Sequence, residues 1–137
     1  MDIYASRLSH YTTFGIDELP ELKNAASLSK TQIMQKEGEM ILKALKAKDF
    51  VILLDEKAKE FGSVGFAKEL SVRRQAGRDL AFVIGGAYGF SPDVYARADS
   101  KMSLSKMTFS HQMVRTIFAE QLYRAFTILR GEPYHHE

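Results

Sequence analysis

The chain has 137 residues and a net charge of +2, and 45% of its residues are hydrophobic. This balance predicts one globular domain over residues 1–137. Cysteine is absent, which excludes disulfides and thiolate metal sites. No stretch has the length of a transmembrane helix or the apolar core of a signal peptide, so we expect a soluble, cytoplasmic protein with no membrane partner.

The first third of the chain predicts two helices and a short strand. Apolar residues recur at helical spacing over residues 2–11. Alternation over residues 14–18 predicts a strand that ends before a proline. Ser29 and Gln32 have the spacing of a capping box, which predicts a helix from there to about residue 47.

The middle of the chain predicts a βαβ unit. Residues 50–54 and 80–84 are continuous apolar runs without alternation, which is typical of strands that are covered on both faces. A helix over residues 63–76 joins them, and Gly77 ends it. The predicted fold class is therefore α/β, with a mostly parallel sheet flanked by helices.

The last third predicts a short helix, a strand with a loop, and a long helix. Ser91 and Pro92 form a strong helix start, and that helix ends near residue 98. Residues 101–109 form a short alternating strand followed by a loop. A helix over residues 110–130 ends before a glycine. Its predicted core face comprises Val114, Ile117, Phe118, Leu122, Ala125, Phe126 and Leu129, with Arg115, Glu120, Arg124 and Thr127 away from it.

Three segments follow the predicted strands, where open α/β sheets bind ligands. They are residues 54–56, 84–89 and 103–109. The middle one reads G-G-x-x-G, which differs from both the dinucleotide fingerprint and the phosphate loop. Its glycines indicate either a close backbone approach to a ligand or a tight turn only. Asp55 is either a solvated strand end or part of the wall of an adenosyl site.

The histidines give no metal site. His10 is most simply structural or solvated. His111 lies four residues before Arg115, and a capping role and a substrate role are equally open. His135 and His136 are adjacent in the tail and point apart, with no third ligand placed by spacing. From these residues alone the chain is an α/β ligand-binding domain without an assigned reaction.

Four segments occur in the order and spacing of the RlmH family of SPOUT methyltransferases, which the chain resembles over essentially its whole length. They are residues 51–57, 82–89, 104–112 and 123–135. The resemblance implies a C-terminal trefoil knot, a rare exception to unknotted topology. It also implies a family strand before the first helix that is missing here. The implied assembly is a homodimer that shares its active site between subunits.

The implied reaction uses S-adenosyl-L-methionine to methylate N3 of the pseudouridine at position 1915, in helix 69 of 23S rRNA in the assembled ribosome. The residues carried over for the cofactor are Leu54, Gly85, Gly89, Leu104, Ser105, Lys106, Met107, Thr108 and Phe109. Those carried over for catalysis are Arg124, Tyr134 and His135, with His135 as a hypothetical proton acceptor. His111, Arg115 and Arg130 are expected to contact the RNA, and no metal is expected.

Three other functions remain open at this stage. One is a SPOUT methyltransferase with another RNA target, such as transfer RNA. Another is a dimeric cofactor-binding module that has lost turnover, which the missing first strand favours and the intact glycines oppose. The third is a flavodoxin-like nucleotide-binding domain, which would carry a phosphate loop after its first strand.

Overall fold

The computed structural model describes residues 2–107 and 109–136, without the side chains of Asp2 and His111. Three parallel strands form its sheet in the order β2-β1-β3: β1 is Phe50–Leu54, β2 is Leu80–Ile84 and β3 is Ser100–Met102. Leu54 pairs with both Ile84 and Met102, so all three strands end at the same edge. The predicted parallel α/β fold is confirmed.

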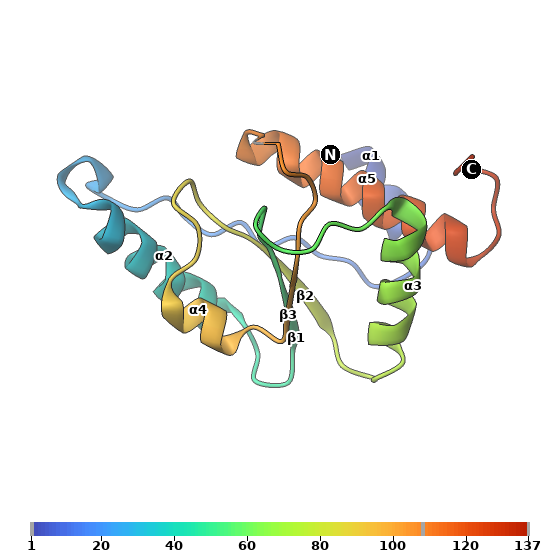
Figure 1. Cartoon of the computed structure of the whole chain (residues 1–137), viewed down its shortest axis with the longest axis horizontal. Coiled ribbons are helices and arrows are strands. Elements are labelled where there is room, and N and C mark those ends of the chain that lie inside the picture. Colours follow the sequence, from blue (N-terminus) through green and yellow to red (C-terminus); the bar gives the residue numbers. More distant parts are fainter. Residues whose placement is uncertain (1, 108, 137) are drawn as a thin grey trace.

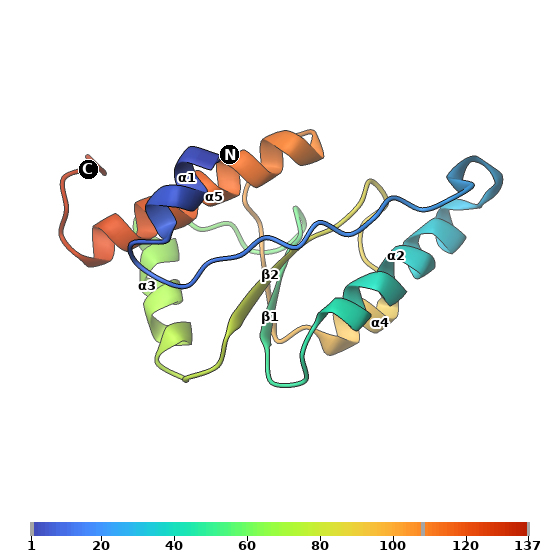
Figure 2. The same cartoon turned by 180° about the vertical axis from the view of Figure 1, so that it is seen from behind.

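In the described part of the chain, five α-helices cover the two faces of this sheet (Figures 1 and 2). On one face lie α1 (Asp2–Leu8), α3 (Ser63–Arg74) and α5 (His111–Leu129). On the other lie α2 (Lys30–Ala44) and α4 (Pro92–Arg97), and a short 3-10 helix, Ala25–Ser27, precedes α2. No helix among the described residues is long and apolar enough to cross a bilayer.

Strand β1 contributes to a separate core on each face. Val51 and Leu53 pack toward α2 and α4, whereas Ile52 packs toward α3 and α5. All three are almost fully buried, and each such side chain contributes about 1.5–3 kcal/mol relative to an exposed one. Burial on both faces explains why this strand reads as a continuous apolar run.

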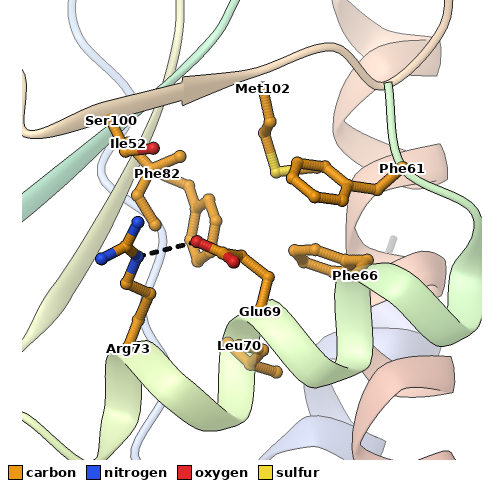
Figure 3. Close-up of a pocket in the computed structure, with 9 residues that line it drawn as sticks. All are labelled: Ile52, Phe61, Phe66, Glu69, Leu70, Arg73, Phe82, Ser100 and Met102. Atoms are coloured by element: carbon orange, nitrogen blue, oxygen red, sulfur yellow. Dashed lines mark hydrogen bonds and ion pairs between the residues drawn. The ribbon is translucent and has the colours of Figure 1, made fainter. Parts of the chain in front are cut away.

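The core on the side of α3 and α5 contains a small gap, between α3 and the sheet (Figure 3). Its volume is about 10 Å³, which is room for about one water molecule. Figure 3 shows Glu69 and Arg73 of α3 joined beside it, with 2.8 Å between their charged atoms. The gap is far too small for a cofactor, so it is a packing defect of the core.

The helix starts follow the predicted capping chemistry. The Ser29 hydroxyl accepts from the amide of Gln32, and the Gln32 side chain accepts from the amide of Ser29. At the starts of α4 and α5, the hydroxyls of Ser91 and Ser110 accept from the amides of Val94 and Met113, and the second of these caps was not predicted. Because these bonds satisfy amides that have no partner inside the helix, they fix where each helix begins.

Three predicted elements are wrong in extent. Residues 14–18 form no strand: no described strand pairs with them, and an extended segment without a ladder partner is not a strand. The first helix ends at Leu8 and α2 ends at Ala44, each about three residues earlier than predicted. Strand β3 is short and is followed by a loop, as predicted: it ends at Met102, and the amide of Ser103 then donates to the carbonyl of Lys59.

Two positions on α5 are also corrected. Leu129, predicted in the core, is 39% exposed, whereas Thr127, predicted outside it, is fully buried. Helix α5 packs against both α1 and α3, so its buried arc is wider than one stripe. The tail then closes over Thr127, whose carbonyl accepts from the amide of Glu132.

Candidate active site

The loops that follow β1 and β3 are joined by main-chain hydrogen bonds. The amide of Asp55 donates to the carbonyl of Met102, and the amide of Ser103 donates to the carbonyl of Lys59, each at 2.8 Å. Lys106 adds a side-chain bridge, because its Nζ donates to the carbonyls of Glu56 (2.9 Å) and Ala58 (2.5 Å). These hydrogen bonds therefore tie the two loops together at the carboxyl edge of the sheet.

The glycine segment after β2 is shaped by contacts inside the protein. A Cβ at Gly85 would lie 2.8 Å from the ring of Phe90, and one at Gly86 would overlap the carboxylate of Glu37. Gly89 has φ of +83°, a conformation that side chains disfavour. The turn and its packing thus account for these glycines, whether or not a ligand also approaches them.

The predicted cofactor residues gather at this edge of the sheet. Leu54, Gly85, Leu104, Ser105 and Phe109 are half-buried there, whereas Gly89, Lys106 and Met107 are exposed. Met107 is 72% exposed and contributes nothing to the core. Thr108 lies outside the described residues.

Asp55 is held by Tyr95, a residue that the sequence analysis did not select. The Tyr95 hydroxyl donates to Asp55 at 2.6 Å, and the amide of Lys57 donates to its other oxygen. Partial burial acts to raise the pKa of Asp55, but these two hydrogen bonds, with Lys101 and Lys57 nearby, lower it on balance. Burial, followed by the bond to Asp55, raises the pKa of Tyr95 to about 12. Asp55 is therefore a structured anchor of the loop after β1.

The predicted catalytic residues meet at the other end of α5, around Glu120. Arg124 donates to Glu120 Oε1 from Nε (2.9 Å) and Nη2 (2.5 Å), and the Tyr134 hydroxyl donates to the same oxygen at 3.3 Å. The Arg124 guanidinium also lies 4.8 Å from the centre of the Tyr134 ring. Burial, then the charge of Glu120, raises the pKa of Tyr134 to about 12, so this phenol stays neutral at physiological pH.

His135 joins the cluster through Arg124, with 3.1 Å between Nη1 of the arginine and Nδ1 of the imidazole. A guanidinium donates hydrogen bonds and accepts none, so Nδ1 must be the acceptor. The proton of a neutral imidazole then sits on Nε2. As held here, His135 presents a donor N–H, and its basic lone pair is occupied by Arg124.

The structure brings together each half of the predicted site but separates the halves within one chain. Phe109 precedes α5, and Arg124 lies thirteen residues beyond the start of that helix. At 1.5 Å per residue, the cofactor loop and the Arg124 cluster are about 20 Å apart along the helix axis.

The predicted RNA contacts are likewise spread along α5. Arg115 pairs with Glu18, whereas Arg130 stacks over the ring of Tyr11 at 4.5 Å. The side chain of His111 lies outside the described part of the chain. Arg115 and Arg130 are about 22 Å apart along the axis, so one chain does not bring them into a single patch.

Two acidic residues of this region were not predicted from the sequence to belong to the site. Glu120 is the shared acceptor of the cluster, and Glu132 accepts from the Tyr11 hydroxyl at 2.8 Å. The spacing of Glu120 and Arg124, four residues apart on a helix, could have indicated the first pair. No sequence spacing links Tyr11 to Glu132, because they are far apart along the chain.

The comparison with protein families decides the identity of the fold. A family model described as "Predicted SPOUT methyltransferase" matches residues 1–135. The chain belongs to the SPOUT methyltransferase family. The resemblance inferred from four short segments is therefore confirmed, and so is a methyltransferase as the general class of this protein.

The relatives within this SPOUT family match almost the whole of this chain and 86–88% of their own length. The chain is 57% identical over 135 residues to a protein of Christiangramia forsetii, covering 98% of this chain and 86% of that one. It is 56% identical over 138 residues to a protein of Flavobacterium johnsoniae, covering 100% and 88%. A protein of Parabacteroides distasonis is 55% identical over 135 residues, covering 98% and 86%. Each of the three is named ribosomal RNA large subunit methyltransferase H.

Proposed function

We propose that this SPOUT protein transfers a methyl group from S-adenosyl-L-methionine to N3 of the helix 69 pseudouridine of 23S rRNA in the assembled ribosome. The observation that carries the proposal is the match to large-subunit methyltransferases at 55–57% identity over almost the whole chain. The target base comes from the family resemblance. The trefoil knot also stays a prediction, and the bonded loops after β1 and β3 are compatible with it.

The loops at the carboxyl edge have the chemistry that the cofactor needs. S-adenosyl-L-methionine supplies a methyl group already activated on a sulfonium, so the reaction itself requires no metal. Leu54 and Leu104 offer half-buried apolar surface for an adenine ring, and the surrounding loops offer main-chain polar groups. The carboxylate of Glu37 lies against Gly86 and borders the same loop. These residues fit the cofactor.

A dimer resolves the separation between the two halves of the site. The methyl donor and the acceptor base must be in contact, whereas the loop at Phe109 and the cluster at Arg124 are about 20 Å apart along α5. A second copy, related by a two-fold axis, brings its own Arg124 cluster to this loop and receives the same in return. Each active site then uses the cofactor loops of one subunit and the tail of the other.

The tail cluster has two tasks in this proposal, which are to hold the base and to take its proton. N3 gives up its proton as it gains the methyl carbon. His135 accepts that proton only if its Nδ1 is released from Arg124, because Nδ1 carries the lone pair of the neutral ring. Arrival of the RNA provides a competitor for Arg124, since guanidinium groups bind phosphate strongly. Arg124 therefore keeps His135 inactive as a base until substrate is bound.

Methyl transfer to defined RNA substrates tests the proposal. Labelled S-adenosyl-L-methionine would be incubated with the protein and with assembled ribosomes, free 23S rRNA or transfer RNA, all from a strain that lacks this modification. We expect label on assembled ribosomes alone, mapping to the helix 69 pseudouridine. Label on transfer RNA would instead identify another target, and cofactor binding without any transfer would identify a binding module.

A further inference from the structure

An open groove lies beside β3 on the side of α4, and the proposed reaction does not use it. It encloses about 440 Å³ and is lined by Asp55, Lys57, Tyr95, Ala98, Asp99, Ser100 and Lys101. Ligand sites of small molecules typically span about 300–1,000 Å³, so one nucleotide fits such a volume. Among the described residues β3 pairs with β1 alone, which leaves its other edge open beside the groove.

Tyr95 gives the groove an aromatic surface that is fixed in place. Its ring is 38% exposed, while its hydroxyl donates to Asp55 at 2.6 Å. Phe90 meets the same ring edge-to-face at 5.8 Å between ring centres. An exposed ring held at its rim is a suitable platform for a nucleic acid base, because every base presents an aromatic face.

The charges of the groove favour an anionic ligand. Asp55 keeps its charge, because the Tyr95 hydroxyl and the Lys57 amide that bond to it are neutral donors, whereas Asp99 faces two arginines as well as the amide of Val51. The two arginines are Arg97 and Arg78.

The two lysines of the groove lie near the single charged carboxylate of Asp55, whose pKa they help to lower, and they outnumber it. Within the described residues, neither Lys57 nor Lys101 has a carboxylate within ion-pair distance, although Lys101 lies 5.3 Å from the centre of the Tyr95 ring. An exposed aromatic ring with one ammonium group beside it, and a second lysine lining the same groove, combines the stacking surface and the positive charge that single-stranded nucleic acid binding uses.

We propose that this groove binds a nucleotide of single-stranded RNA, with the base on Tyr95 and the flanking phosphates on Lys57 and Lys101. That the ligand is RNA rests on the proposed function. Because the groove begins at Asp55, next to the cofactor residue Leu54, its nucleotide would lie close in sequence to the methylated base. The groove would then help to position the loop of the RNA.

A single tryptophan tests the stacking contact directly, because the chain has no tryptophan of its own. The Tyr95→Trp protein would be titrated with an oligouridine of five nucleotides at low salt. Val72→Trp is the matched control, since Val72 is 58% exposed on α3, across the sheet from the groove. We expect fluorescence quenching from Tyr95→Trp and none from Val72→Trp. Equal quenching at both positions would overturn the proposal.

Anisotropy of a labelled oligouridine provides a second measurement that does not depend on the tryptophan. Tyr95→Phe keeps the ring and should bind within about threefold of the original protein, whereas Tyr95→Ala should weaken binding about tenfold. The Lys57→Gln, Lys101→Gln double variant should also weaken it and reduce the salt dependence by about two phosphate contacts. Lys68→Gln, on exposed α3 surface, should change nothing.

Methyl transfer to ribosomes by the unmodified protein would be measured in parallel. Active protein without site-specific quenching would refute the groove and leave the proposed function standing. Quenching that depends on the two lysines, in a protein that does not methylate ribosomes, would support the groove and refute that function. Binding that Tyr95→Ala leaves unchanged would refute the groove in either case.

Discussion

Each half of the proposed active site is stabilised internally by a different kind of interaction. The loops at the carboxyl edge are joined largely through main-chain groups, as in the bonds from Asp55 to Met102 and from Ser103 to Lys59. The cluster at the end of α5 is instead a side-chain network in which Arg124 and Tyr134 share one oxygen of Glu120. The first half therefore responds to changes in packing and the second to changes in charge.

The largest effect is expected from removing the imidazole of the tail. His135→Ala should lower methyl transfer by about 10²–10⁴-fold if His135 is the general base, with cofactor affinity unchanged. His135→Gln separates two roles, because its amide can replace the Nε2 donor but cannot accept the proton. Calorimetry would measure the cofactor affinity of each variant, and assays on ribosomes would measure its rate of methyl transfer. Full activity of the Gln variant would mean that His135 orients the base and does not take its proton.

A glycine substitution tests the half that is built by packing. In Gly85→Ala the new Cβ would lie 2.8 Å from the ring of Phe90, which is buried. Such overpacking typically costs about 1–3 kcal/mol, and here it should also shift the cofactor loop. Urea unfolding and cofactor titration measure the two effects. Gly15→Ala is the control, because nothing lies near a Cβ there. Equal stability of both variants would contradict the packing account.

The fold was predictable where local chemistry determines it. The capping serines and the uninterrupted apolar strands gave the helix starts and the parallel sheet, because these signals act within a few residues. The short strand at residues 14–18 was predicted wrongly because pairing depends on a partner elsewhere in the chain. The burial of Thr127 was missed for a similar reason, since it depends on where the tail packs.

The candidate site was predictable only in part. The positions after each strand followed from the α/β fold, and the tail residues followed from family resemblance. The roles of Glu120 and Tyr95 depend on contacts across the fold, such as the bond from Tyr95 to Asp55, forty residues away. The tautomer of His135 depends on the donor that faces its ring, which the sequence does not place.

A smaller effect is expected from the bridge between the two joined loops. Lys106→Met removes the ammonium that binds the carbonyls of Glu56 and Ala58. Because Lys106 is exposed, water can replace it, and we expect cofactor affinity to fall by only about threefold to tenfold. Lys106→Arg should recover most of the loss. Unchanged affinity for both variants would show that the main-chain bonds alone hold the loops.

The smallest effect concerns ionisation of the tyrosines. Hydrogen bonding to Glu132 is the main cause that raises the pKa of Tyr11 to about 12. For Tyr95 and Tyr134 the pKa is also raised to about 12, and burial is the main cause. The pKa in the folded protein exceeds the ordinary value of 10.0. The contribution of these neutral phenols to the free energy of unfolding is therefore fully present below pH 10 and is lost as the pH rises through 12. Tyrosinate absorbance should therefore include a late component that decreases in Tyr134→Phe. A late component that is unchanged in Tyr134→Phe would contradict the raised pKa of Tyr134.

Heterodimer complementation tests most directly the claim that two subunits share each site. Two variants would be co-expressed with different affinity tags: Ser105→Trp, which fills the cofactor loop, and His135→Ala, which disables the tail. Each homodimer should be inactive, whereas the purified heterodimer should regain about half of the original activity, because one of its two sites combines an intact loop with an intact tail. A heterodimer as inactive as both homodimers would contradict the account and place both halves of the site in one subunit.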